Sequence, residues 1–259
     1  MRVALKLAYD GTLFYGYARQ PNLKTVEGEI IKTCIETGLF HSIEDANPKS
    51  ASRTDKGVSS LCNVFVFNTT YTPREVLSIL SENLPLDTII PYATTKVNNS
   101  FNPRHALLRH YRYYIPKENR DINRIREISK VFLGLHDFTN FAKIEPGKTP
   151  NRKISNISIK LEGGLIVIDF YAPTFLWNQI RRIVSAILKA ERGEITIEDI
   201  SSALGNPNVR VDHGVAPAEP LILMDIRYKN ISFEYHPTLT MRCKKIEDKI
   251  RKRVKSLSF

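Results

Sequence analysis

The sequence predicts an α+β protein built from two halves with the same order of elements, β-α-β-β-α-β. Segments in which apolar and polar residues alternate indicate strands, and apolar residues spaced three and four apart indicate helices. Turn residues separate these segments. The element order of the first half then recurs in the second half. We therefore expect two ferredoxin-like halves joined into a mostly antiparallel sheet, with helices on one face and a basic cleft.

The first half supplies all six elements of this order. The alternating run from Arg2 to Tyr9 ends at Asp10-Gly11, which is typical of a strand followed by a turn. Thr25 and Thr72 are suitable N-caps for two helices, and Pro73 suits a first helical position. The predicted elements are strands at 2–9, 49–52, 61–68 and 89–96, and helices at 25–39 and 73–84.

The second half repeats the order of elements without repeating the residues. A tyrosine-rich strand comes first, and Gly163-Gly164 forms the turn of a hairpin. The predicted elements are strands at 109–115, 154–161, 165–171 and 221–228, and helices at 121–133, 176–192 and 197–204. We expect the boundary within residues 101–106, which makes the domains 1–104 and 105–259.

The composition favours a polyanionic partner. Among 259 residues, 38 are Lys or Arg and 27 are Asp or Glu, so the formal net charge is +11. Such a balance is typical of nucleic-acid binding, although a basic surface that serves only solubility stays possible. Cys34, Cys62 and Cys243 lie far apart, so we expect no metal site and a reducing compartment. Without a signal peptide or a long apolar segment, the expected location is the cytoplasm.

Asp55 is the first candidate for chemistry. It lies between Arg53 and Gly57 on a predicted tight loop between two strands. A carboxylate in such a place can act as a nucleophile, a general base or a metal ligand. An Asx turn without catalytic function is the alternative.

The strand that begins at Arg109 is the second candidate. Strand alternation places Arg109, Tyr111 and Tyr113 on one face. Tyrosine beside arginine suits stacking on a base and binding of phosphate. Ordinary aromatic packing of an amphipathic strand is the alternative.

Two further segments carry clustered positive charge. On the predicted helix from Leu176, Arg181 lies at the edge of the apolar stripe, where it can reach a buried carboxylate. Arg182 points nearly opposite, toward solvent or RNA. The tail at 242–259 holds eight basic and two acidic residues and predicts a basic helix, suited to phosphates or simply solvated.

Six motifs in sequence order carry a resemblance to a known family. They are Tyr9-Asp10-Gly11-Thr12, Arg53-Thr54-Asp55-x-Gly57-Val58, Phe101-Asn102-Pro103-Arg104 with Arg109-x-Tyr111-Arg112-Tyr113, His136-Asp137-Phe138-Thr139-x-Phe141, Phe175-Leu176 with Ile180-Arg181, and Ala216-Pro217-Ala218-Glu219 with Leu221-x-Leu223. Together they resemble the TruA family of tRNA pseudouridine synthases. The chain departs from the family pattern at Ser52, Ser59 and Pro220, where Gly, His and Gly are common.

The resemblance implies isomerisation of uridine to pseudouridine in the anticodon stem-loop of tRNA, in the region of positions 38 to 40. It assigns Asp55 as the nucleophile, and Arg181 as the charge that keeps it ionised. Tyr111 stacks on the base and removes the C5 proton. It implies that Arg53 holds the flipped nucleotide and that Leu221 packs against the uracil. We also expect Arg109, Tyr113 and Arg182 to contact the substrate.

The same resemblance implies a homodimer without a cofactor, a metal or a membrane association. Two other readings of the residues stay open. A non-catalytic RNA-binding protein or chaperone would use the same basic cleft, but it does not require Asp55, Tyr111 and Arg181 together. A glycosidase-like hydrolase would need a second acid across the scissile bond, and the motifs supply none.

Overall fold

The computed structural model describes residues 1–257, and in it the chain divides into two compact units. The first unit contains Met1–Leu107 and Ile222–Lys252. The second contains Leu108–Leu221 and, among the described residues that follow Lys252, residues 253–257. The predicted boundary between residues 104 and 105 thus falls close to the first change of unit, but the prediction did not anticipate the return of the chain to the first unit.

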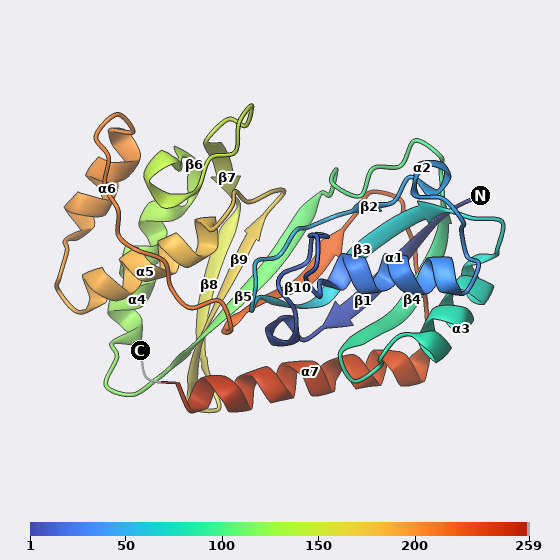
Figure 1. The fold of residues 1–259 in the computed structure, drawn as a ribbon. Coiled ribbons are helices and arrows are strands. Elements are labelled where there is room, and N and C mark those ends of the chain that lie inside the picture. The colour runs from blue at the N-terminus through green and yellow to red at the C-terminus, as the bar shows by residue number, and fades with distance from the viewer. Residues whose placement is uncertain (258–259) are drawn as a thin grey trace. The chain divides into compact units, whose positions relative to one another are not determined.

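The sheet of the first unit is centred on its first strand (Figure 1). Strand β1 pairs with β3 on one side and with β4 on the other, both antiparallel. Strands β2 and β11 extend the sheet as antiparallel partners of β3 and β4, whereas β10 runs parallel to β3. The strands are β1 (Arg2–Tyr9), β2 (Lys49–Ser50), β3 (Ser59–Asn68), β4 (Ile89–Val97), β10 (Leu221–Arg227) and β11 (Glu234–Tyr235).

Two capped helices lie on one face of this sheet. The Thr25 side chain accepts a hydrogen bond from the Gly28 N–H, and Thr72 forms a capping box with Glu75. After the first helix, the ring of Phe40 meets that of Phe67 on β3 edge to face, with the centroids 5.4 Å apart. The helices are α1 (Val26–Glu36) and α3 (Pro73–Asn83), with two shorter segments, η1 (Gly11–Leu13) and α2 (Ile43–Ala46).

The long helix α7 (Pro237–Lys255) covers the other face of the same sheet. Its buried stripe consists of Leu239, Cys243, Ile246 and Ile250. Burial raises the pKa of the Cys243 thiol, and the nearby Cys62 on β3 raises it further. Because Cys62 and Phe67 alternate to opposite faces of β3, α7 and α1 lie on opposite sides. The expected arrangement, with helices on one face only, therefore differs from the structure of this unit. Because helices cover both faces of the sheet, every residue of the central strand β1 is buried.

The sheet of the second unit has the order β5-β9-β8, and all its pairings are antiparallel. A separate antiparallel pair, β6 and β7, precedes β8 in the chain. Helix α4 packs against α5 and β8. The elements are β5 (Leu108–Pro116), α4 (Ile122–Ser129), η2 (Lys130–Phe132), β6 (Gly134–Asp137), η3 (Thr139–Phe141), β7 (Asn151–Ile154), β8 (Asn156–Glu162), β9 (Leu165–Ala172), α5 (Gln179–Glu191) and α6 (Ile197–Gly205).

The structure confirms a mixed α and β protein with mostly antiparallel strand pairing, and each predicted strand and helix has a counterpart. A shift in the start of an element occurs at α5, which begins at Gln179 and not at Leu176. Asn178 has a left-handed conformation with φ of 59°, and the Gln179 side chain accepts the Leu176 N–H. The short elements α2, β6, β7 and β11 were not predicted. Among residues 1–257, no helix combines the length and the apolar character needed to cross a bilayer.

Candidate active site

The Asp55 loop connects β2 to β3 and continues the alternation of a strand. Ser52 and Thr54 are buried. Arg53, between them, is exposed, and Asp55 is half-buried. The two residues whose chemistry the sequence singled out therefore share the accessible side of the chain.

A tight turn follows Asp55 and closes against the turn after β1. The Val58 N–H donates to the Asp55 carbonyl at 3.1 Å, and Gly57 adopts a φ of 88°, which favours glycine. The Gly57 N–H donates to the Gly11 carbonyl at 3.2 Å. A Cβ atom on Gly11 would lie 2.0 Å from the Val58 carbonyl oxygen. Only glycine at position 11 therefore permits this close packing of the two turns.

Asn63 ties the start of the loop to β3. Its Oδ1 accepts the Ser52 N–H at 3.2 Å, and its Nδ2 donates to the Ser52 carbonyl at 2.8 Å. The side-chain amide thus makes with Ser52 the two bonds that a neighbouring strand would make. The next pair, the Ala51 N–H and the Val64 carbonyl, is an ordinary backbone bond of 2.9 Å. The loop is therefore held to β3 as far as Ser52.

Tyr9 holds the loop at Thr54, two residues after Ser52. Its hydroxyl lies 2.8 Å from Thr54 Oγ1, and the Asn63 Nδ2 donates to the same hydroxyl at 3.3 Å. The Thr54 carbonyl accepts the Tyr17 N–H at 3.0 Å. The sequence motifs give Tyr9 no catalytic role and do not include Asn63. An Asn on a strand between buried apolar residues is the only sequence signal for it.

The accessible rim of the loop is cationic and aromatic. Lys56 is exposed and its Nζ lies 4.3 Å from the centre of the Tyr15 ring, which is itself exposed. Ser59, which departs from the family pattern, is the first residue of β3 and directly follows the loop. Its buried hydroxyl accepts the Gly11 N–H at 3.0 Å, so it also fixes the two turns to each other.

In the second unit, Tyr111 lies on β5 and contacts Phe175 edge to face, with the ring centroids 5.4 Å apart. Arg109 is buried on the same face, and its guanidinium donates to the Pro173 carbonyl. The alternation predicted from Arg109 to Tyr113 is confirmed, because these residues are buried and the residues between them are partly exposed.

Tyr113 and Arg181 hold the loop that precedes β10. The Tyr113 hydroxyl donates to the Pro217 carbonyl at 3.0 Å, and Arg181 Nε donates to the Ala216 carbonyl at 2.8 Å. Arg181 Nη1 also donates to the Asn178 side chain at 3.2 Å. Tyr113 is 0% exposed, and this burial raises the pKa of its hydroxyl. Such burial does not support the expected contact between Tyr113 and the substrate.

Arg182 and Leu221 complete the predicted residues. Arg182 forms an ion pair of 2.8 Å with Asp212, and burial covers most of its side chain. Arg182 was expected to face solvent or RNA, and in the structure its guanidinium is paired with the exposed Asp212. Leu221 is buried at the first position of β10, and its N–H donates to the Ala218 carbonyl at 3.0 Å.

A buried ion cluster on the other face of β5 was missed by the sequence analysis. Asp169 on β9 accepts from Arg112 Nε at 2.7 Å and lies 2.6 Å from His110 Nε2. The His110 ring stacks on Tyr171 with the centroids 4.4 Å apart. The register of β5 and β9 places Arg112 directly opposite Asp169, but that register is not visible in the sequence.

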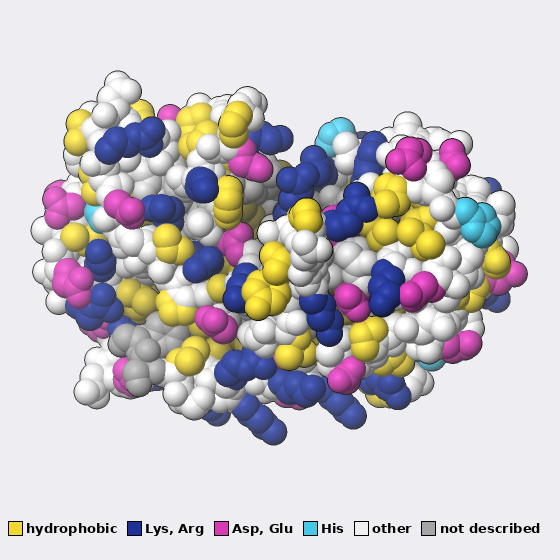
Figure 2. Space-filling model, in the orientation of Figure 1, with side chains coloured by type: hydrophobic (Ala, Val, Ile, Leu, Met, Phe, Trp, Pro, Cys, Tyr) yellow, Lys and Arg dark blue, Asp and Glu magenta, His cyan; other side chains and the backbone are white. Residues whose placement is uncertain are grey.

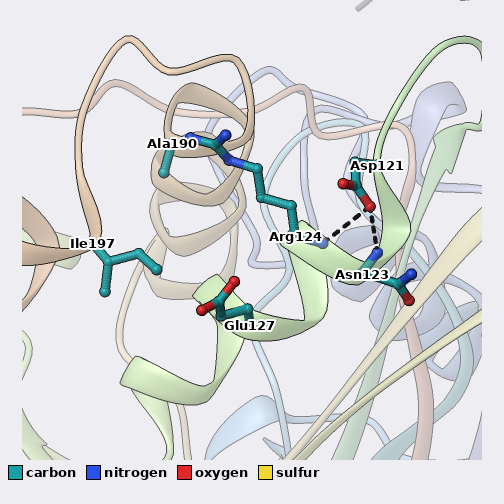
Figure 3. Close-up of a pocket in the computed structure, with 6 residues that line it drawn as sticks. All are labelled: Asp121, Asn123, Arg124, Glu127, Ala190 and Ile197. Carbon is teal, nitrogen blue, oxygen red and sulfur yellow. Dashed lines mark hydrogen bonds between the residues drawn. The ribbon is translucent and has the colours of Figure 1, made fainter.

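A surface cavity of about 340 Å³ lies elsewhere in the second unit (Figure 3). Six residues line it, and the Asp121 carboxylate accepts the N–H groups of Asn123 and Arg124 there. None of the predicted site residues takes part. The lining residues are Asp121, Asn123, Arg124, Glu127, Ala190 and Ile197. Within residues 1–257, no group of three or more His, Cys, Asp or Glu side chains is arranged to hold a metal ion.

Comparison with known proteins identifies the family. Residues 128–229 match the family model described as tRNA pseudouridine synthase. The tRNA pseudouridine synthase A of Thermococcus sibiricus is 41% identical over 90% of this chain and 87% of its own length. That of Pyrococcus abyssi is 37% identical over 98% of this chain and 95% of its own length.

These likenesses define a pseudouridine synthase. The chain belongs to the tRNA pseudouridine synthase family, which confirms the resemblance of its motifs. Among solved structures, a Cbf5-Nop10-Gar1 complex aligns with a TM-score of 0.36 and 14% identity, over 72% of this chain and 44% of that chain.

Proposed function

We propose that this protein isomerises uridine to pseudouridine in the anticodon stem-loop of tRNA, in the region of positions 38 to 40. The observation that carries the proposal is the 37% identity over 98% of the chain to a curated tRNA pseudouridine synthase A. The reaction moves the uracil from a C–N to a C–C bond and needs no redox partner. The enzyme is accordingly an isomerase that acts on tRNA uridine.

Asp55 is the proposed nucleophile. A carboxylate nucleophile must be accessible, ionised and aimed at its target. The alternation from Ser52 to Asp55 supports this role, because it turns the carboxylate outward beside Arg53, our proposed ligand for the phosphate of the flipped nucleotide. Arg181, anchored by Ala216 and Asn178, is the proposed cation that keeps the nucleophile ionised.

Tyr111 is the proposed base that removes the C5 proton after the uracil has turned. Its contact with Phe175 fixes the plane of its ring, as stacking on a base requires. We propose that Leu221 packs against the uracil and that Arg109 supports Tyr111 from the same face of β5. The bonds of Arg109 and Tyr113 to carbonyl groups favour supporting roles for both residues over direct substrate contact.

The charge distribution supports a tRNA partner. A base within a stem must leave its stack before it can react, at a cost of about a few kcal/mol, and phosphate contacts can offset this cost. Figure 2 shows Lys and Arg side chains gathered along the helix α7. Arg242, Lys244, Lys245, Lys249 and Lys252 are exposed there, and among the described residues none of the five forms an ion pair.

We also propose the finer features of the fold and the assembly. The antiparallel order β4-β1-β3-β2 in the first unit is that of a ferredoxin-like half, which supports a first ferredoxin-like domain at 1–104. A homodimer is the form that the family resemblance implies, and the cytoplasm is the expected location.

The decisive experiment maps pseudouridine in unmodified tRNA transcripts incubated with the purified protein alone, with Asp55→Asn alongside. We expect new signals in the anticodon stem-loop that vanish with Asp55→Asn, while tRNA affinity stays within severalfold. Wild-type turnover by Asp55→Asn would remove Asp55 from the nucleophile role. Tight binding without any signal would favour a non-catalytic RNA-binding protein, and released uracil would favour a hydrolase.

A further inference from the structure

We propose that the Tyr9 hydroxyl and the Asn63 side-chain amide are positioning groups that hold Asp55 in its reactive orientation, acting through Thr54 and the backbone of Ser52. The inference rests on the proposed function, in which Asp55 is the nucleophile, and it extends the site to residues that touch no substrate.

Burial separates these groups from any ligand. Tyr9 and Asn63 are both 0% exposed, and Thr54 and Ser52 are buried as well. Their polar atoms therefore interact with the protein and not with tRNA. A polar group in such a place costs free energy unless it is hydrogen-bonded, so a fully bonded cluster specifies one arrangement of the chain.

The hydrogen bonds define the orientation of the Asn63 amide. Its Oδ1 accepts from two backbone N–H groups, those of Ser52 at 3.2 Å and Val64 at 2.9 Å. Its Nδ2 donates to the Ser52 carbonyl and to the Tyr9 hydroxyl. A flipped amide would place N–H groups against N–H groups. Asn63 therefore bonds to both the N–H and the carbonyl of Ser52. This pair of bonds is possible in only one register of the loop against β3.

The Tyr9 hydroxyl extends these hydrogen bonds from Asn63 to Thr54. Because Asn63 Nδ2 can only donate, the Tyr9 oxygen accepts from it, and its own proton is available for Thr54 Oγ1 at 2.8 Å. Tyr9 itself is placed by a register shift of β1 against β3 between Leu7 and Tyr9. The bonded chain thus runs from β3 through β1 to the residue that precedes Asp55.

The consequence for Asp55 follows from strand geometry. Side chains alternate between two faces, so a slip of one residue would turn Asp55 inward and Thr54 outward. The inward bonds at Ser52 and Thr54 oppose such a slip on both sides of Arg53. Loss of the bonds should loosen the aim of the carboxylate without emptying the core, and misplacement of a reacting group by about 1 Å can cost about 100-fold in rate.

The test removes hydroxyl groups and leaves shape intact. Tyr9→Phe and Thr54→Val each delete one partner of the bond, and Thr54→Ser restores the hydroxyl. Tyr17→Phe is the matched control, since Tyr17 is also 0% exposed and lies 5.8 Å from Tyr9 between ring centroids. Its hydroxyl makes no hydrogen bond to the Asp55 loop among the described residues.

We would measure single-turnover rates and tRNA Kd for these variants, for Asp55→Asn and for the double variant Tyr9→Phe/Thr54→Val, with melting temperatures by circular dichroism. Tyr9→Phe and Thr54→Val should each lower the rate by about 10- to 100-fold, with Kd within about twofold. The double variant should be no slower than the slower single variant, because both delete the same bond. Thr54→Ser and Tyr17→Phe should stay close to wild type.

Each other outcome counts against the proposal. Folded Tyr9→Phe and Thr54→Val proteins with near wild-type rates would overturn it, as would an equal loss in Tyr17→Phe or multiplied losses in the double variant. If one variant melts below the assay temperature, the other carries the comparison. An active Asp55→Asn protein would instead overturn the proposed function, and with it this inference.

Discussion

Single atoms decide the geometry of the Asp55 loop. The absent Cβ of Gly11 admits the Val58 carbonyl, and the hydroxyl of Ser59 accepts the Gly11 N–H. Ser59 stands where the family commonly has His, so this chain uses a small hydroxyl to join two turns. Both contacts leave the carboxylate of Asp55 on the accessible side of the chain.

Gly11→Ala tests the close approach of the two turns. The added methyl group would overlap the Val58 carbonyl, so one turn must move. Overpacking of this kind costs about 1–3 kcal/mol of unfolding free energy, and we expect turnover to fall as well because the Asp55 loop shifts. Urea denaturation and the mapping assay measure both effects. Gly205→Ala is the control, since a Cβ there meets nothing within 4 Å, and an equal loss in both variants would contradict the explanation.

Tyr111→Phe tests the last chemical step. In the proposed mechanism the phenol of Tyr111 removes the C5 proton, so for this variant we expect the glycosidic bond to break and the pseudouridine yield to fall by about 100-fold or more. Mass spectrometry of digested tRNA would detect the stalled adduct. Tyr114→Phe, on the other face of β5, is the control. An unchanged yield from Tyr111→Phe would exclude Tyr111 as the base.

At the scale of elements, the Asp169 cluster joins the neighbouring strands β5 and β9 of the second unit. Asp169 on β9 binds Arg112 and His110, which lie two residues apart on β5. Burial alone would raise the pKa of Asp169, but hydrogen bonds from His110 and Arg112 outweigh it and the pKa is lowered. The carboxylate is thus held ionised between two strands, on the face opposite Tyr111.

Asp169→Asn should lower the unfolding free energy at pH 7 by about 3 kcal/mol, because Arg112 would keep a buried charge without its partner. A lowered pKa in the folded state stabilises the fold above the unfolded value of about 3.9 and loses this effect as the pH falls through the folded value. The difference from wild type should therefore shrink below about pH 4. Urea denaturation at pH 7 and pH 3 measures it, with exposed Asp248→Asn as control, and a pH-independent difference would contradict the cluster.

The elements themselves were largely predictable. Local signals were sufficient for α1 and α3, because Thr25, Thr72 and Pro73 cap or begin helices by contacts within one turn. The later start of α5 was not, since it depends on the left-handed backbone of Asn178. The short strands β6, β7 and β11 have too few residues to show a period, and their pairing is with distant segments.

At the scale of the whole molecule, charge should govern the affinity for tRNA. We expect the logarithm of the association constant to fall linearly with the logarithm of salt concentration, with a slope of about −0.7 to −0.9 for each phosphate contact. Filter binding between 50 and 300 mM salt, as a rough range, measures this slope. Asp55→Asn should share the wild-type slope, since it removes no cation. An affinity independent of salt would contradict the proposed tRNA contacts.

Replacing Lys245, Lys249 and Lys252 with Gln measures how much of the salt dependence of tRNA binding comes from α7. The three side chains are exposed, and the period of the helix places them away from the buried stripe of α7. We expect the slope to become shallower by about one for each contact that is lost. An unchanged slope would show that the helix is a solvated cover of the sheet and that the phosphates bind elsewhere.

The sequence by itself determined the element order and the family, and it singled out candidates for direct chemistry, because alternation, capping and short motifs are local properties. Asp55, Tyr111 and Arg181 stood out for that reason. Only the tertiary structure revealed that α7 covers the second face of the first sheet, that Tyr113 is buried, and that Asn63 and Tyr9 hold the Asp55 loop. These features depend on contacts between residues far apart in the chain, and such contacts are decided by register and packing.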